Sequence, residues 1–375
     1  MATEIIFWVA VATIGYSYLG YGLVLLIRSN WRPRPVRRAA FSPFITIVMV
    51  VRNEAAILER KLRNLMHLNY NAERLEVVIV SDGSTDGTNS ILRDFVGPLP
   101  LQILVTQQSS GKASGINEAM SIASGEIVVF TDARQRIDRD ALRLLMENFA
   151  DPDIGCVSGQ LMLGDPESGE SSTGLGLYWR IEKRIRELEA STGSVIGATG
   201  ALYAARRDLI PTLPGETILD DVYIPMHILK TGARVTFDPR ACAWDVPDHG
   251  RQREFSRKVR TLSGNFQLLQ LAPWLLSNEN PARFGFVSHK LLRLIVPLAL
   301  LADLGTAALL REPIYRFALV LQLAFYILGV WALLRPRRNF LPRIADVAST
   351  FVLLNTAALV ALANFLAGRK PVWAP

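Results

Sequence analysis

An uncharged apolar run near the N-terminus, residues 5–27, constrains the fold more than any other feature of the chain. A helix rises about 1.5 Å per residue, so a run of this length crosses the roughly 30 Å of hydrocarbon in a bilayer. The run is longer than a signal-peptide core, and no small-residue cleavage site follows it. Because a cluster of arginines follows instead, the positive-inside bias predicts that the next segment is cytoplasmic. The cluster consists of Arg28, Arg32, Arg34, Arg37 and Arg38.

Three apolar stretches in the last quarter of the chain are also long enough to be spans, at about 291–310, 314–334 and 344–367. The basic loop 335–343 joins the last two, and its charge predicts a cytoplasmic position. Four spans would place both termini outside the cytoplasm. Half of the residues are hydrophobic and the mean hydropathy is positive, which also favours an integral membrane protein.

The segment 44–245 has the pattern of a soluble α/β domain. Short apolar runs predict buried strands of a mostly parallel sheet, and helical patterns between them predict crossovers that cover both faces. The expected strands are 45–51, 75–81, 101–106 and 126–131, and the expected helices are 55–68, 86–95, 112–123, 138–149 and 174–190.

The segment 253–276 combines a basic first half with an apolar second half, which predicts a helix at the membrane interface. We therefore divide the chain into four parts. They are an N-terminal span with a basic linker (1–40), a cytoplasmic α/β domain (41–250), an amphipathic interface segment (251–285) and three transmembrane helices (286–375).

The net charge of +7 is compatible with nucleic acid, an anionic membrane surface or a phosphate-bearing substrate. The arginines cluster beside apolar stretches, and no nucleic-acid module, zinc spacing or repeat occurs, so we expect a bilayer and no nucleic-acid partner. Cys156 and Cys242 lie far apart, so we expect no disulfide framework and a reducing compartment for the middle domain.

Polar residues follow three of the expected strands: Asn53 and Glu54, then Asp82, then Asp132. Ligands of open parallel sheets bind at the carboxyl ends of the strands, so these residues are placed to meet a nucleotide. Carboxylates beside a diphosphate recruit Mg²⁺ or Mn²⁺, which makes Asp132 a candidate metal ligand. The alternative interpretation is a set of turns and helix starts, where acidic residues are also favourable.

Three further positions carry chemistry in their residue types. Lys112 opens a helix, where it can contact phosphate or be a solvated surface lysine. Asp220 and Asp221 precede a helical run; one of them can be a general base, or both can stabilise the helix N-terminus. Arg257 and Arg260 are three residues apart and share a helix face, which could grip a diphosphate or meet lipid headgroups.

The order of these segments is more specific than any one of them. The runs VVRNEA, EVVIVSDGSTDGT, GKASGINEA, FTDA, LDD and RKVRT together resemble the family 2 inverting glycosyltransferases with a GT-A fold. The resemblance covers about 44–270 and is to the membrane-integrated branch that includes cellulose, chitin and hyaluronan synthases and ceramide glucosyltransferase. It implies transfer from a nucleotide-sugar, a UDP-hexose or UDP-N-acetylhexosamine, to a lipid or growing saccharide. The implied location is the bacterial inner membrane, with the catalytic domain in the cytoplasm and with partners in a synthase or export complex.

The resemblance also implies roles for individual residues. Asp82 would contact the uracil, and Asp132 would hold Mg²⁺ or Mn²⁺ as the first acid of the family's Asp-x-Asp motif. Asp221, the last acid of the Thr-Glu-Asp motif, would be the catalytic base, while Gly200 and Asp220 would line the acceptor side. The residues implied to bind the nucleotide-sugar are Asn53, Glu54, Asp82, Lys112, Asp132, Arg257 and Arg260.

Two positions depart from the family pattern. Arg134 stands where the second acid of Asp-x-Asp is expected, so a metal would have fewer protein ligands. Thr261 stands where the family has a Trp that helps to hold the acceptor sugar in processive synthases, which weakens the expectation of long-chain synthesis. Two other functions remain compatible with the residues: a nucleotidyltransferase, and a catalytically silent nucleotide-sugar-binding partner in a polysaccharide export complex.

Overall fold

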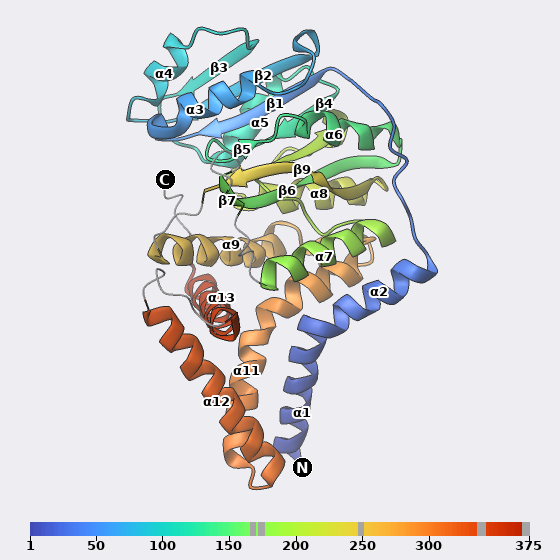
Figure 1. Ribbon diagram of the computed structural model, residues 1–375, viewed down its shortest axis with the longest axis vertical. Coiled ribbons are helices and arrows are strands. Elements are labelled where there is room, and N and C mark those ends of the chain that lie inside the picture. The colour runs from blue at the N-terminus through green and yellow to red at the C-terminus, as the bar shows by residue number, and fades with distance from the viewer. Residues whose placement is uncertain (166–169, 172–176, 247–250, 336–342, 370–375) are drawn as a thin grey trace.

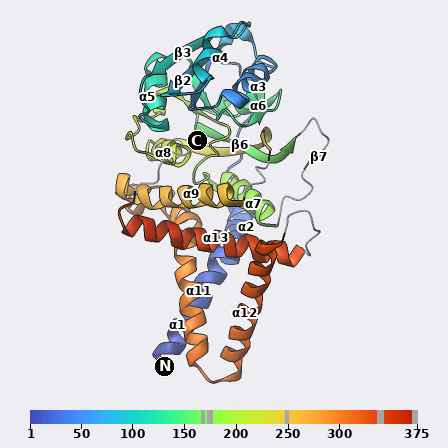
Figure 2. The same ribbon diagram turned by 90° about the vertical axis from the view of Figure 1, so that its left-hand side faces the viewer.

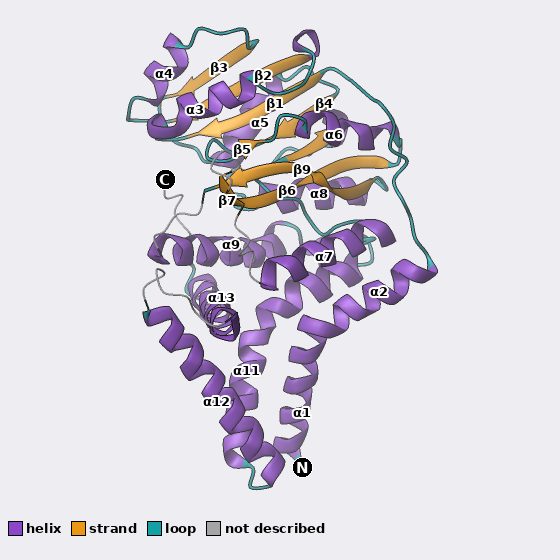
Figure 3. Cartoon of the chain, viewed as in Figure 1, coloured by secondary structure: helices purple, strands orange, loops and turns teal. Residues whose placement is uncertain are grey.

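A computed structural model describes residues 1–165, 170–171, 177–246, 251–335 and 343–369. The sheet domain forms one end of the molecule, and long helices converge toward the opposite end, where the N-terminus lies (Figure 1). Coloured by secondary structure, the strands are confined to the first end and a layer of helices separates them from the converging helices (Figure 3). Most of the basic loop 335–343 lies outside the described residues, so its cytoplasmic position stays a prediction.

The first half of the sheet is parallel and confirms the four predicted strands. Its order is β3 (Leu101–Thr106), β2 (Leu75–Asp82), β1 (Ile45–Val51) and β4 (Ile127–Phe130). Every residue of β1, β2 and β4 is buried, as expected for strands with both faces covered. Because the strands are parallel, their carboxyl ends meet at one edge, and Asp82 and Asp132 come to that edge.

The second half makes the sheet mixed rather than mostly parallel. β4 pairs antiparallel with β8, β8 antiparallel with β6, β6 parallel with β9, and β9 antiparallel with β5. These strands were not predicted, because β6 and β9 carry polar residues such as Gln160 and Asp238 that interrupt the apolar pattern. The pairing of β6 with β9 also contains two shifts of register. The strands are β5 (Arg136–Ile137), β6 (Ile154–Asp165), β8 (Tyr203–Arg206) and β9 (Arg234–Asp245), with the short β7 (Glu170–Ser171) beside β6.

Helices cover both faces of the sheet, as predicted. α5 and α8 pack on the face that carries Val48 and Val50, whereas α3 and α6 pack on the face that carries Ile47 and Met49. The bounds are α3 (Ala55–Met66), α4 (Thr88–Asp94), α5 (Lys112–Ile122), α6 (Ala141–Glu147) and α8 (Asp220–Lys230). Short 3-10 turns occupy Ala72–Arg74, Asn148–Ala150, Arg207–Leu209 and Pro273–Leu276.

Two helices beneath the sheet, α7 (Leu177–Thr192) and α9 (Arg251–Leu271), separate it from the apolar helices (Figure 1). They correspond to the helices predicted at 174–190 and 253–276. Leu268 of α9 is fully buried in the core on the α5 and α8 face of the sheet. Helix α9 therefore packs into the core of the sheet domain.

Four continuous helices among the described residues are long and apolar enough to cross a membrane, one near the N-terminus and three near the C-terminus. The chain is therefore an α/β protein with four candidate membrane spans. The four are Ala2–Trp31, Arg283–Leu309, Pro313–Leu334 and Ile344–Leu366. They contain α1 (Ala2–Gly15), α2 (Tyr21–Trp31), α10 (Arg283–Gly285), α11 (Leu292–Leu309), α12 (Pro313–Leu334) and α13 (Arg343–Leu366), with π-helical segments at Tyr16–Gly20 and Phe286–Leu291.

The four apolar helices do not all run in one direction. α1, α11 and α12 extend away from the sheet, whereas α13 lies across them, directly beneath α9 (Figure 2). Length and composition confirm the predicted apolar helices. The crossing of a bilayer by α13, and with it the location of both termini outside the cytoplasm, stays a prediction.

Candidate active site

Three elements bring charged residues to one place at the edge of the sheet. Asp132 follows β4, Lys112 is the first residue of α5, and Asp220 is the first residue of α8. The Lys112 ammonium lies 2.9 Å from Oδ1 of Asp132 and 3.1 Å from Oδ1 of Asp220. α5 can begin at this point because Gly111 before it has φ +97°, a conformation that favours glycine. The lysine therefore cross-links the two acids.

Asp221 lies beside this cluster and is held by the loop before β8. The backbone N–H of Gly200 donates to Oδ2 of Asp221 at 2.9 Å, and the N–H of Ala198 donates to its carbonyl oxygen at 2.6 Å. A Cβ placed on Gly200 would lie 3.3 Å from Oδ2 of Asp221 and 3.8 Å from Oδ2 of Asp132. Gly200 thus keeps the space between the two carboxylates free of a side chain.

The two neighbouring acids, Asp220 and Asp221, have different environments. Asp220 is buried; it accepts a hydrogen bond from the Tyr203 hydroxyl at 3.0 Å and pairs with Lys112. Both of its oxygens therefore have protein partners. Asp221 is half-buried and accepts from one backbone N–H. The geometry favours Asp221 as the acid that meets a substrate and Asp220 as the acid that holds Lys112.

Electrostatics poise Asp221 for proton transfer near neutral pH. Burial and the neighbouring Asp220 charge raise the pKa of Asp221 to about 6, against the opposing effects of Lys112 and Lys290. A carboxylate with this pKa is ionised at pH 7 and is a stronger base than an ordinary aspartate. Burial alone would lower the pKa of Lys112, but Asp132 and Asp220 raise it well above its usual value, so the lysine stays charged.

One of the two predicted arginines joins the cluster. Burial lowers the pKa of Arg260 of α9, and the charges of Asp132, Asp220 and Asp221 oppose that effect, so the guanidinium and the three acids interact electrostatically. For Arg257, the described residues show no hydrogen bond or ion pair to these acids. A grip of both arginines on one diphosphate stays a prediction.

Asp82 is fully buried, and its carboxylate is engaged by the protein itself. It accepts hydrogen bonds from the Ser109 hydroxyl at 2.7 Å, the Ser110 N–H at 2.7 Å and the Gly111 N–H at 3.0 Å. These bonds fix the turn that starts α5 and so position Lys112. The predicted contact of Asp82 with uracil stays a prediction, and it would require this turn to release the carboxylate.

Asn53 and Glu54 connect the loop after β1 to the loop after β2. The Asn53 side-chain oxygen accepts from the Thr85 N–H at 2.8 Å, and the Glu54 N–H donates to the Thr88 hydroxyl at 2.9 Å. Asn53 has φ +54°, which its short polar side chain tolerates. Burial raises the pKa of the Glu54 carboxyl; the charge of Arg134 opposes this effect and the charge of Asp132 adds to it.

The donor set for a metal is small. Arg134 turns away to pair with Asp245 at 2.6 Å, and among the described residues no group of three His, Cys, Asp or Glu side chains could hold an ion. Asp132 retains Oδ2, the oxygen that Lys112 does not contact, and its side chain is 41% exposed. Mg²⁺ is commonly held by one or two carboxylates together with substrate phosphates. The residues therefore fit an ion that binds with a diphosphate.

A lysine that we did not predict supports the Asp132 loop. Lys61 is fully buried in α3, and its ammonium donates to the Thr131 hydroxyl at 2.9 Å and the Gln135 carbonyl at 2.7 Å. Burial lowers its pKa to about 7. A signal was present in the sequence: Lys61 shares the apolar face of the predicted helix with Leu58.

A second missed residue, Gln267 of α9, holds the segment before Asp220. Its side-chain oxygen accepts from the Ile218 N–H at 3.0 Å, and its amide donates to the Glu216 carbonyl at 2.7 Å. One turn away, a Cβ on Gly264 would lie 2.6 Å from the Leu219 side chain. The interface helix therefore packs directly on the chain segment that presents both acids. No sequence signal distinguishes Gln267 from other polar residues of that helix.

The α/β sheet, the acids that converge at its edge and the long apolar helices together define a GT-A-like fold with candidate membrane spans. Residues 46–213, somewhat less than half of the chain, match the family described as Glycosyl transferase family 2. The matched segment begins in β1 and ends just before α8.

Two named proteins are similar to this chain over part of their length. The chain is 25% identical over 234 residues to poly-beta-1,6-N-acetyl-D-glucosamine synthase of Staphylococcus aureus, covering 60% of this chain and 55% of that protein. It is 24% identical over 302 residues to beta-monoglucosyldiacylglycerol synthase of Synechocystis, covering 76% of this chain and 61% of that protein. The chain thus spans little more than half the length of these relatives.

A solved mannosyltransferase from Pyrobaculum calidifontis, in complex with GDP-Man and Mn²⁺, has the same fold. The TM-score is 0.74 at 24% identity, and the match covers 97% of this chain and all of that one. The likeness includes the apolar helices as well as the sheet domain, because it extends over nearly the whole chain. It confirms the predicted fold class.

Proposed function

We propose that this protein transfers a sugar from a nucleotide-sugar to an acceptor hydroxyl, with inversion at the anomeric carbon and with Asp221 as general base. The observation that carries the proposal is the convergence of Asp221 and Asp132 on Gly200. The space beside Gly200 lies between the carboxylate of Asp221 and that of Asp132, which is paired with Lys112. A donor sugar in this space would have the face that the acceptor attacks toward Asp221 and its leaving group toward Asp132 and Lys112.

Asp221 and the two cations, Lys112 and Arg260, have different roles in the proposed reaction. Asp221 takes the proton from the acceptor hydroxyl, and the oxygen attacks the anomeric carbon on the face opposite the leaving nucleoside diphosphate. Lys112 contacts the acids from α5, and Arg260 of α9 interacts with them electrostatically, so both cations can stabilise charge that develops on the departing diphosphate. Direct displacement needs one base and no covalent intermediate.

A divalent ion, Mg²⁺ or Mn²⁺, would be held by Asp132 and the donor's phosphates, and it would help to neutralise the leaving group. The named relatives act as synthases of an N-acetylglucosamine polymer and of a glucosyl lipid, and the solved neighbour binds GDP-Man and Mn²⁺. We therefore propose a hexose or N-acetylhexosamine donor carried on UDP, with a lipid or saccharide acceptor. We further propose that the sheet domain faces the cytoplasm of a bacterial cell.

The test uses the full chain, purified into lipid nanodiscs and incubated with a panel of UDP- and GDP-sugars. Release of the nucleoside diphosphate together with a product heavier by one sugar supports the proposal. Release of pyrophosphate instead identifies a nucleotidyltransferase, and saturable donor binding without turnover identifies a silent nucleotide-sugar-binding partner. Either of the latter two results contradicts the proposal.

A further inference from the structure

A buried network of charged side chains lies where α7 meets the apolar helices. The ring of His289 lies between two carboxylates of α7, with Nδ1 at 2.8 Å from Glu189 and Nε2 at 3.0 Å from Glu182. Arg293 also contacts Glu182, at 2.6 Å, and the Tyr21 hydroxyl donates to Glu189 at 2.8 Å. An ionised carboxylate only accepts hydrogen bonds, so both nitrogens of the ring donate and the ring is a cation. Two carboxylates therefore face two cations.

The network joins two parts of the molecule. Tyr21, His289 and Arg293 belong to helices that are long and apolar enough to cross a membrane, whereas both glutamates belong to α7. Glu189 and His289 are only 2% and 3% exposed. Burying charges costs free energy, and a buried ion pair is often no more stable than an apolar pair of the same size. Packing stability alone is therefore a poor reason for these charges.

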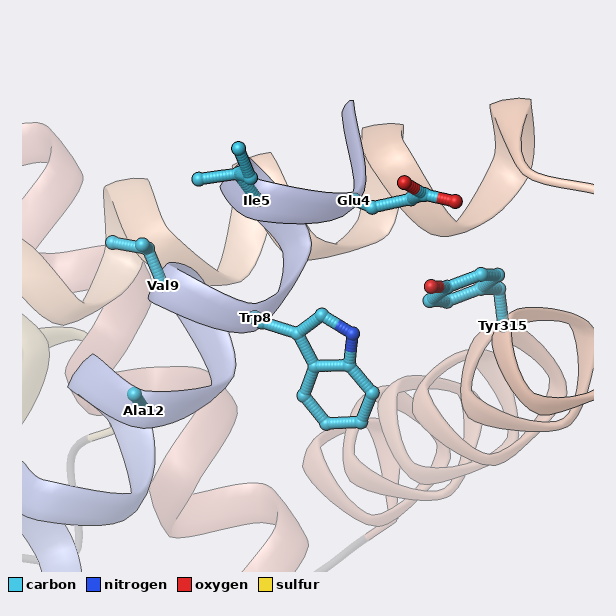
Figure 4. Close-up of a pocket in the computed structure, with 6 residues that line it drawn as sticks. All are labelled: Glu4, Ile5, Trp8, Val9, Ala12 and Tyr315. Atoms are coloured by element: carbon cyan, nitrogen blue, oxygen red, sulfur yellow. The ribbon is translucent and has the colours of Figure 1, made fainter. Parts of the chain in front are cut away.

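An acidic residue at the other end of the apolar helices has different surroundings. Glu4 lines a hollow together with Trp8 and Tyr315, near the N-terminal end of α1 (Figure 4). Its carboxylate pairs with the N-terminal ammonium at 3.1 Å, and its side chain is 40% exposed. This end lies opposite the sheet, so Glu4 has no part in the reaction, whereas the buried network lies at α7, next to the sheet domain (Figure 1).

Two side chains of α7 connect the network to the loop before β8. Oε2 of Glu189 accepts a hydrogen bond from the Ile196 N–H at 3.4 Å, and the Arg186 guanidinium donates to the Ala198 carbonyl at 3.1 Å. Glu189 follows Arg186 by three residues, so both side chains share one face of the helix. Between the two bonded loop residues, Gly197 has φ +102°, a conformation that favours glycine. Helix α7 thus holds the loop on both sides of this turn.

The same loop holds the proposed base. The Ala198 N–H donates to the carbonyl oxygen of Asp221 at 2.6 Å, and the Gly200 N–H donates to its Oδ2 at 2.9 Å. Ile196, which Glu189 holds, precedes Gly200 by four residues. Hydrogen bonds and one short stretch of backbone therefore lead from the network to the carboxylate of Asp221.

We propose that Glu189 is a positioning residue for Asp221, and that Tyr21 and His289 fix Glu189 from the apolar helices. This inference rests on the proposed transfer reaction and adds the group that orients its base. Asp221 can take the acceptor's proton only while its carboxylate keeps the orientation that the Gly200 N–H sets. The packing of the apolar helices against α7 therefore controls the geometry of a base that lies in the sheet domain.

The test compares two substitutions of the same kind on one helix. Glu189→Gln removes the charge that faces His289. Glu187→Gln is the matched control, because it removes a partly exposed carboxylate that pairs with Arg184. Both variants and the wild-type protein are studied as full chains in lipid nanodiscs by hydrogen–deuterium exchange with mass spectrometry. The amides of residues 196–200 should exchange about tenfold faster or more in Glu189→Gln, and at the wild-type rate in the control.

Steady-state turnover gives a second readout. Misplacement of the base should lower kcat of Glu189→Gln by about tenfold or more and leave donor KM unchanged. Burial and Asp220 raise the pKa of Asp221 to about 6, and the Gly200 N–H opposes them, so loss of that bond raises this pKa further. The acid limb of the pH profile should therefore move upward by about 0.5–1 pH unit.

The direction of that change separates positioning from simple electrostatics. Removing the negative charge of Glu189 would by itself favour the ionised form of Asp221 and move the acid limb downward. The charged groups that act on Asp221 are the same in every variant; they are Asp220, Lys112, Lys290 and Arg260.

Tyr21→Phe is a milder variant, because it removes one hydrogen bond to Glu189 and almost no volume. It should change the exchange, kcat and the acid limb in the same directions by smaller amounts, and thermal unfolding shows that each variant folds. Exchange and pH profiles of Glu189→Gln and Tyr21→Phe equal to those of Glu187→Gln would overturn the proposal. A downward move of the acid limb, or a loss of donor affinity as large as the loss of kcat, would overturn it as well. If the wild-type protein transfers no sugar, the proposed function fails, while the exchange rates still decide whether Glu189 holds the loop.

Discussion

The ammonium of Lys112 lies 2.9 Å from Oδ1 of Asp132, and the same ammonium reaches Asp220. A fixed cation therefore stands between the acid at the end of β4 and the acid at the start of α8. This arrangement places a positive charge beside the proposed leaving group without any ion from solution.

Replacing this cation should damage the reaction more than the fold. Lys112→Met should lower kcat/KM by about 10²-fold or more, comparable to the loss of one preorganised donor in other active sites. Lys112→Arg keeps the charge in a different geometry and should recover part of the loss. Steady-state nucleotide release measures both. Lys230→Met, which removes a lysine paired with Glu279 on the surface, is the control, and equal rates for the two Met variants would contradict the role.

The raised pKa of Asp221 sets the pH dependence. The base form of the carboxylate predominates above its pKa of about 6, so kcat/KM should be level near pH 7 to 8 and fall about tenfold for each pH unit below about 6. Nucleotide release between pH 5 and 8, with stability checked at each pH, gives the profile. A rate that stays level down to pH 5 would show that no group with this pKa acts as base.

A divalent ion should bind only together with a nucleotide. Asp132 supplies one carboxylate, and Arg134 is held by Asp245, so the protein alone offers too few ligands. Calorimetric titration with Mn²⁺ should give no heat of binding for the free protein and clear binding in the presence of UDP or GDP. Asp132→Asn should remove the nucleotide-dependent binding. Stoichiometric Mn²⁺ binding without nucleotide would refute this account of the metal.

The close contact of α9 with the segment before Asp220 requires a residue without a side chain at Gly264. In an exposed helix, Gly to Ala stabilises by about 1 kcal/mol, but a Cβ on Gly264 would lie 2.6 Å from Leu219 and must displace it. Gly264→Ala should therefore reduce turnover by about tenfold or more, because Leu219 precedes both acids. Gly305→Ala in α11 meets nothing within 4 Å and should keep full activity. Equal activity of the two variants would argue against positioning by α9.

Much of the parallel half of the sheet follows from the sequence, because buried parallel strands are continuous apolar runs such as Ile45–Val51. The acids at strand ends are predictable for the same reason. Hydrogen-bond partners are not, since Asp82 meets Ser109 only after β2 and β3 pair. The different environments of Asp220 and Asp221 depend on Tyr203, a residue of the short strand β8 that the sequence did not predict.

The composition of α13 does not predict its orientation either. An apolar helix of this length fits both a span and a helix lying across others, and only packing against α9 and α12 separates the two. Lys61 shows the opposite case, in which a single polar residue on an apolar helix face already marks a buried contact. Local pattern therefore predicts the buried parallel strands and the helices, but not the strands β5, β6, β8 and β9 or most long-range polar contacts.

The measurement that tests the central claim most directly is transfer by Asp221→Asn with the donor that the wild-type protein uses. The amide can still accept from Gly200, so the loop should keep its position. We predict that product formation falls by about 10²–10⁴-fold, as expected for loss of a general base, while donor affinity remains close to that of the wild-type protein. Turnover of Asp221→Asn at the wild-type rate would contradict the assignment of the base and the mechanism built on it.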